Sequence, residues 1–71
     1  MNNRLEELRT QRGIKQEELA SLLRVSRQTI SSLENGRYNP SILLALKIGR
    51  FFGCPVEEIF ILDEEDQNHA L

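Results

Sequence analysis

Apolar residues recur at helical spacing along most of the chain, and no stretch alternates between apolar and polar residues as a half-buried strand would. Glycines interrupt this pattern at Gly13, Gly36 and Gly53, where each can close a helix in the left-handed conformation. The sequence therefore predicts short helices joined by short loops. We expect these helices at residues 4–12, 16–24, 27–35, 42–52 and 56–60.

Residues that favour helix starts precede most of these segments. Asn2 or Asn3 can cap the first helix, and Ser26 and Ser41 can cap the third and the fourth. Pro55 suits the first turn of the fifth helix because its backbone angle is already helical. These residues indicate where each helix begins.

The chain has 71 residues, so folding hides only about 60% of the surface that an extended chain exposes. That allows one small core and no second domain. A ligand cavity of about 300–1,000 Å³ also needs more wall than so short a chain supplies. We expect one compact all-α, five-helix domain over residues 4–62, followed at residues 63–71 by an acidic, disordered tail.

Few side chains are available for catalysis or metal binding. Cys54 is the only cysteine, which excludes an internal disulfide and a site with several cysteine ligands. His69 is the only histidine and lies near the end of the sequence, so a catalytic base there would have no support. We therefore expect no enzyme, no metal site and no cofactor. No apolar run reaches the roughly 20 residues that span a bilayer, and no signal peptide is recognisable, so a cytoplasmic protein is expected.

The charges are unevenly distributed, although the formal net charge is only −2. Residues 1–56 hold all nine Lys and Arg against five acidic residues, and residues 57–71 hold the other six acids. A basic body with an acidic end is compatible with phosphate binding on one face. The alternative interpretation of the acidic run is a solvated tail.

Residues 16–35 carry the most informative pattern, two short helices separated by Val25-Ser26, as in a helix-turn-helix. One face of the second helix is polar and free of acidic residues. This face comprises Arg27, Gln28, Ser31, Ser32 and Asn35, and it lies opposite Ile30 and Leu33. A helix that enters a DNA groove must keep carboxylates away from phosphates, whereas a solvated face usually mixes both signs. The pattern indicates a DNA-reading helix, with a protein-binding helical hairpin as the alternative.

The side-chain chemistry of this face favours DNA. An arginine such as Arg27 can bond guanine O6 and N7 together, and a glutamine such as Gln28 can bond adenine N6 and N7. Ser31 and Ser32 are short, so base edges can approach the helix backbone. Double-stranded DNA is therefore the expected partner.

Longer stretches of the sequence resemble the phage-repressor and Cro-like helix-turn-helix family, also called XRE-like. The resemblance rests on Gln16-Glu17-Glu18-Leu19-Ala20, Val25-Ser26, Thr29-Ile30-Ser31-Ser32-Leu33-Glu34-Asn35-Gly36, Tyr38-Asn39-Pro40-Ser41 and Leu44-Ala45-Leu46-Lys47-Ile48. It spans residues 4–60, nearly the whole chain. It implies a lambda-repressor-like DNA-binding domain, most similar to the short single-domain bacterial regulators of this family.

The resemblance also implies roles for individual residues. The base-reading positions are Arg27, Gln28, Ser31 and Ser32. The phosphate-binding positions are Lys15, Gln16, Asn35 and Arg37. Arg9 and Glu34 match a partly buried pair that ties the first helix to the third. For Gln16 the alternative is an ordinary helix-start residue, and for Asn35-Gly36 it is a simple helix end.

Two positions depart from the family pattern. Lys15 stands where Ser or Thr often caps the second helix, so a cap worth about 1 kcal/mol is lost and a positive charge is gained. Cys54 stands at the similar cap position before the fifth helix. A small buried thiol in place of a hydroxyl is the simpler interpretation, and a redox-sensing thiol is the alternative.

Four consecutive apolar residues occupy positions 59–62, close to the acidic end. Phe60, Ile61 and Leu62 are expected to form the contact between two copies, and closure of the core is the alternative use. A homodimer places two recognition helices about 34 Å apart on a palindromic site. We thus expect a homodimeric, sequence-specific transcriptional regulator that represses by covering a promoter. The alternative is an antitoxin-like protein-interaction module with secondary DNA binding.

Overall fold

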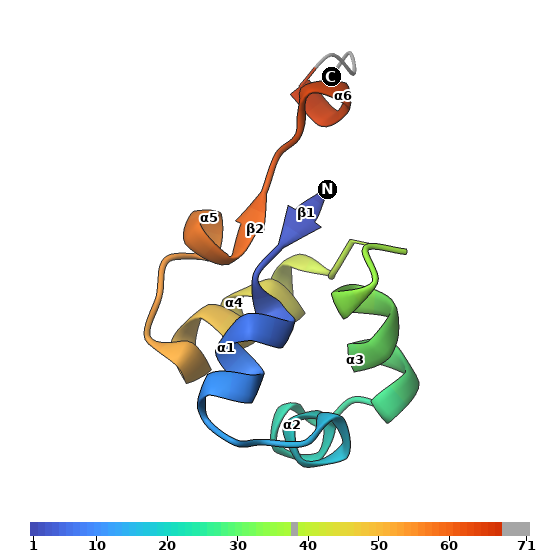
Figure 1. Ribbon diagram of the computed structural model, residues 1–71, viewed down its shortest axis with the longest axis vertical. Helices are drawn as coiled ribbons and strands as arrows, with labels where there is room; N and C mark the ends of the chain where they lie inside the picture. The colour runs from blue at the N-terminus through green and yellow to red at the C-terminus, as the bar shows by residue number, and fades with distance from the viewer. Residues whose placement is uncertain (38, 68–71) are drawn as a thin grey trace.

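The computed structural model describes residues 1–37 and 39–67. Five helices build the body of the molecule (Figure 1): α1 (Leu5–Gln11), α2 (Gln16–Leu23), α3 (Arg27–Glu34), α4 (Ile42–Phe52) and α5 (Val56–Ile59). All five lie where the sequence predicts them, and the bounds of α4 agree at both ends. The all-α helix-turn-helix fold is therefore confirmed.

A single core holds the five helices together, and each helix contributes to it. The fully buried large side chains are Leu5, Leu19, Ile30, Leu33, Ile48 and Ile59. The helical spacing in the sequence brings these residues to the inner faces, where burial of a large aliphatic side chain contributes about 1.5–3 kcal/mol. The core fixes the orientation of α3, because Ile30 and Leu33 anchor its inner side.

Helix α4 differs from the others because its outer side is also apolar. Ile42 is 81% exposed, and Leu43 and Leu46 also lie on the surface. On the inner side, Gly49 lets α4 pack closely against the segment before α5: an added Cβ would lie 3.0 Å from the carbonyl oxygen of Cys54, which would have to shift. No helix within residues 1–37 and 39–67 is long and apolar enough to cross a membrane.

Serine side chains cap α3 and α4 as predicted. Ser26 Oγ accepts the Thr29 N–H at 3.1 Å, and Ser41 Oγ accepts the Leu44 N–H at 3.1 Å. The expected asparagine cap of α1 is wrong in position, because Arg4 is the cap residue. The Asn3 side chain nevertheless accepts the N–H of Leu5, at 3.1 Å.

The two positions that depart from the family pattern behave differently from each other. Lys15 occupies the N-cap position of α2, but its side chain makes no capping hydrogen bond. Its backbone N–H instead donates to Glu18 Oε1 at 3.2 Å. Cys54 is not a cap, because Pro55 occupies that position at α5. The Cys54 thiol is half-buried and donates to the Phe52 carbonyl.

The prediction that the chain holds no strands is wrong at its two ends. Strand β1 (Asn2–Asn3) pairs antiparallel with β2 (Phe60–Ile61), with Asn2 opposite Ile61 and Asn3 opposite Phe60. A strand of two residues shows no alternation of polarity, so the sequence could not reveal it. The pair brings the start of the chain against the segment that follows α5 (Figure 1).

The expected disordered tail at residues 63–71 contains a helix in its described part, and residues 68–71 lie outside the described residues. Residues 61–67 form what we call the C-terminal arm, which ends in helix α6 (Glu64–Gln67). Asp63 Oδ1 accepts the Asp66 N–H at 2.8 Å, and Asp66 Oδ2 accepts the Asp63 N–H at 3.1 Å. This reciprocal capping starts a helix within an acidic run. His69 lies outside the described residues.

The arm is held by charge to the ammonium group at the start of the chain. The Met1 ammonium lies 3.4 Å from the carboxylates of both Asp63 and Asp66. The backbone N–H of Asp66 is the main cause that lowers the pKa of Asp63, and the Met1 ammonium lowers it further. Partial burial acts to lower the pKa of that ammonium, but hydrogen bonds to Asp66 and Asp63 raise it above its usual value.

The pKa of Asp63 predicts that the arm loosens in acid. Because the folded pKa lies below the ordinary value, charged Asp63 stabilises the arm above the ordinary pKa. This contribution disappears as the pH falls through the lowered pKa. We expect the Asp66 amide to be protected from hydrogen exchange near neutral pH and to lose that protection in acid. Asp63→Asn, which does not titrate, is the control; equal pH dependence in both proteins would contradict the assignment.

Arg24 ends α2 in the left-handed conformation, with φ +61°. Among residues 1–37 and 39–67 it is the only non-glycine with a positive φ. The conformation lets the Val25 N–H reach the Ala20 carbonyl at 2.9 Å and turns the chain toward α3. The tight turn of the helix-turn-helix is thus achieved with some backbone strain.

Arg24→Gly should stabilise the domain. The left-handed conformation costs a non-glycine residue about 1–2 kcal/mol, and the greater freedom of unfolded glycine offsets part of that gain. We expect the free energy of unfolding in urea to rise by roughly 0.5–1 kcal/mol. Arg24→Ala keeps the Cβ atom and serves as the matched control, for which no such rise is expected. A destabilised Arg24→Gly protein would show that Arg24 contributes a contact that outweighs the strain.

Candidate nucleic-acid interface

The outer face of α3 is polar, as the sequence predicts. Arg27 and Gln28 are exposed at its first turn, and Ser31 and Ser32 are half-buried one turn further along. Ile30 and Leu33 point the opposite way, into the core. The structure thus gathers the four candidate base-reading residues on one side of one helix.

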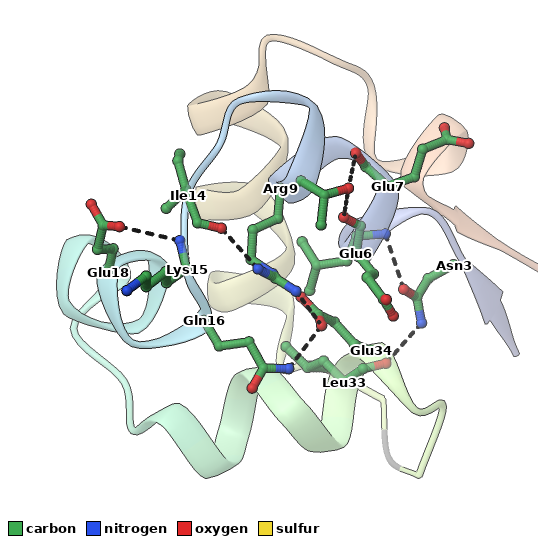
Figure 2. Close-up of polar contacts among 12 residues, drawn as sticks. Asn3, Glu6, Glu7, Arg9, Ile14, Lys15, Gln16, Glu18, Leu33 and Glu34 are labelled. Carbon is green, nitrogen blue, oxygen red and sulfur yellow. Dashed lines mark hydrogen bonds and ion pairs between the residues drawn. The ribbon is translucent and has the colours of Figure 1, made fainter.

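The only acidic residue of α3 is turned away from this face. Figure 2 shows Glu34 directed toward α1, where Arg9 Nε donates to its Oε2 at 2.6 Å and Arg9 Nη2 to its Oε1 at 3.2 Å. The two side chains are only 12% and 3% exposed, respectively. The hydrogen bond to Glu34 raises the pKa of Arg9 above its usual value. The predicted structural pair is therefore present, and it removes a carboxylate from the outer face.

The pair extends into a network that joins three helices. Arg9 Nη1 donates to the carbonyl of Ile14 in the loop after α1, at 2.8 Å. Gln16 Nε2, at the first residue of α2, donates to Glu34 Oε1 at 2.9 Å (Figure 2). One N–H of the Gln16 amide is thereby occupied, and the other remains for a further acceptor such as a phosphate oxygen. Gln16 thus positions α2 against α3, a role separate from the phosphate contact expected of it.

The expected phosphate-binding residues fall into two groups. Lys15, Gln16 and Arg27 line one surface hollow of about 350 Å³, together with Arg9 and Glu17. Asn35 and Arg37 follow the other end of α3, and both are exposed. Cationic and amide groups therefore lie next to Arg27 at the start of α3 and directly after its last residue.

Asn3 supports the far end of α3, a role that the sequence analysis missed. Its Nδ2 donates to the Leu33 carbonyl at 2.8 Å, while its Oδ1 accepts from Leu5 (Figure 2). One side chain thus joins the end of α3 to the start of α1. Asn3 and Leu33 are 30 positions apart, so local sequence signals do not reveal this hydrogen bond. Only the pairing of β1 with β2, which fixes where Asn3 lies, could have pointed to this role.

The three residues expected at a dimer contact do not share one environment. Phe60 is only 8% exposed and belongs to the core, whereas Ile61 and Leu62 are 42% and 59% exposed. Phe60 therefore closes the core, which is the alternative use that the sequence left open, and Ile61 and Leu62 remain the candidates for the contact. Beside it, Met1, Pro40, Ile42 and Val56 help to line a surface hollow of about 400 Å³. Exposed Ile42 was not singled out because its helix has an apolar sequence throughout.

This arrangement, a capped helix packed across a second helix through a tight turn, defines a helix-turn-helix DNA-binding domain. The family model described as Helix-turn-helix matches residues 5–59. The chain belongs to this XRE-like family of transcriptional regulators. The family is one of DNA-binding regulators and is not a class of enzymes.

Relatives from archaea and bacteria support the assignment. An HTH-type transcriptional regulator of Methanocaldococcus jannaschii is 47% identical over 66 residues, which are 93% of this chain and all of that protein. The regulator YgzD of Bacillus subtilis is 46% identical over 66 residues, with the same coverage of both chains. The competence pilus inhibition repressor of Acinetobacter baylyi is 41% identical over 65 residues, which are 89% of this chain and 57% of the repressor.

Breaking the Arg9–Glu34 pair should destabilise the domain strongly. Arg9→Met leaves the buried carboxylate of Glu34 without its charged partner, and we expect a loss of about 3 kcal/mol in urea unfolding. Arg4→Met is the matched control, because Arg4 pairs with Glu7 at 2.6 Å on the surface. The control should unfold almost as the parent does, since exposed pairs contribute little. Equal losses in the two variants would contradict the role of the buried pair.

Proposed function

We propose that this regulator is a sequence-specific repressor that binds a palindromic operator as a homodimer, with α3 in the major groove. The observation that carries the proposal is the outer face of α3, which presents Arg27 and Gln28 and no carboxylate. A groove of B-DNA about 12 Å wide accepts one helix, and its edges carry phosphates that would repel an exposed acid. The capped turn and the core hold this face outward.

Arg27, Gln28, Ser31 and Ser32 are the proposed base-reading residues. The long side chains of Arg27 and Gln28 lie at the exposed N-terminal turn, which is the part of a recognition helix that reaches base edges. The half-buried serines keep the next turn narrow, so the helix can lie deep in the groove. Arginine favours guanine and glutamine favours adenine at the positions they contact.

Lys15, Gln16, Asn35 and Arg37 are the proposed phosphate-binding residues. One group lies with Arg27 at the start of α3 and the other follows its last residue, and we expect both to contact phosphates at the edges of the groove. The N-terminus of α2 adds the partial positive charge of a helix start beside Lys15. These contacts set the position of α3 and make binding dependent on salt.

A homodimer supplies the second half-site contact. One helix of eight residues reads few base pairs, and a palindrome with half-sites about 34 Å apart doubles the contacts. Ile61 and Leu62 are exposed and available for the contact between copies. We propose that the dimer represses by covering a promoter in the cytoplasm. The 41% identity to a repressor of Acinetobacter baylyi supports the repressor role.

Gln28→Ala tests base reading directly. Bound sites are first selected from a random DNA pool, and affinity for the selected site is then measured at several salt concentrations. We expect the variant to lose about 1–3 kcal/mol at that site and to relax base preference at one position in each half-site. Its unfolding should not change, because Gln28 is exposed.

Gln11→Ala is the matched control, since Gln11 is exposed at the end of α1 and away from α3. Its affinity and base preference should equal those of the parent. Unchanged binding by Gln28→Ala, or equal affinity of the parent for scrambled and selected DNA, would count against the proposal.

A further inference from the structure

The α4 outer face, which we define as Leu43, Leu46, Lys47 and Arg50, has no role in the proposed DNA contact. Leu43 and Leu46 are 63% and 57% exposed, and the four residues line one surface hollow of about 410 Å³. Helix α4 contains no acidic residue. The face therefore combines exposed leucines with positive charge.

The two cationic side chains of this face can each bind a further acidic group. Within residues 1–37 and 39–67, no carboxylate lies within ion-pair distance of Lys47 or Arg50. Lys47 Nζ donates to the carbonyl of Leu23 at 3.3 Å, which holds it near the end of α2. DNA backbone contacts need cations but gain nothing from two exposed leucines. The composition of the face fits an apolar and acidic peptide better than it fits phosphate.

The C-terminal arm of the same chain has the complementary composition. Exposed Ile61 and Leu62 are followed directly by Asp63, Glu64, Glu65 and Asp66. The carboxylates of Asp63 and Asp66 bind the Met1 ammonium, and each also accepts the backbone N–H of the other residue. Glu64 and Glu65 are exposed. Figure 1 shows that the arm leads from β2 away from the body of the molecule. Its attachment to β1 places it where another molecule can reach it.

From this complementarity we infer that the arm of one copy docks on the α4 outer face of a second copy, and that the second arm returns the contact. The inference rests on the homodimer of the proposed function and names the surface that receives Ile61 and Leu62. In each contact the arm supplies two exposed apolar residues and two exposed glutamates. The α4 outer face supplies two leucines and two cations. A twofold axis makes both contacts at once, so the buried area doubles toward the roughly 1,200 Å² that a stable interface needs.

A charge exchange tests the pairing. Arg50→Glu and Glu65→Lys each place like charges across the proposed contact, and each should raise the dimer dissociation constant about tenfold in sedimentation equilibrium at low salt. Both side chains are exposed, so folding should not change. The double variant Arg50→Glu/Glu65→Lys should recover the parent's dissociation constant. Glu6→Lys, an exposed charge reversal on α1, is the control and should dimerise as the parent does.

The outcomes separate this inference from the proposed function. A dimer that survives Arg50→Glu but dissociates on Ile61→Ser/Leu62→Ser overturns the docking on α4 and leaves the homodimer intact. Loss of the dimer in both single variants without recovery in the double variant also overturns it, because the acidic partner of Arg50 then lies outside the arm. A parent chain that stays monomeric overturns both the docking and the homodimer, while DNA reading by Gln28 remains tested separately.

Discussion

The ion pair of Arg9 and Glu34 is the interaction on which the rest of the structure depends. It is almost completely buried, and its bidentate geometry fixes the distance between α1 and α3. The carboxylate of Glu34 also accepts from Gln16, so the first residue of α2 is set by the same group. Because the Arg9 guanidinium neutralises the Glu34 carboxylate, the fold can bury this carboxylate without leaving an unpaired charge. One glutamate thus ties together, through polar contacts, three helices that the core packs against one another.

Much of the fold could be predicted because its signals are local. Ser26 and Ser41 mark helix starts through bonds that span only three residues, and Gly53 ends α4 where expected. The strand pair and the arm could not be predicted, because they depend on partners at opposite ends of the chain. Asn3 illustrates the difference: its bond to the neighbouring turn follows from sequence, whereas its bond to Leu33 requires the folded chain.

The candidate site could be predicted in outline and not in its details. Helical spacing is enough to place Arg27 and Gln28 opposite Ile30, and the structure confirms that arrangement. The same spacing cannot show that an amide such as Gln16 is shared with a buried carboxylate. Nor does an apolar run reveal which members face inward. Phe60 entered the core because the chain turns into β2 there, and the two residues after it were left outside.

The outer residues of α3 add no side-chain hydrogen bonds to the domain. In the described portion of the chain, the side chains of Arg27, Gln28, Ser31 and Ser32 make no hydrogen bond to another residue. The hydrogen-bond network of the scaffold therefore does not include these four side chains. Single substitutions can therefore change the outer residues of α3 without removing a hydrogen bond that stabilises the fold. This property suits a fold that recurs in both archaeal and bacterial genomes.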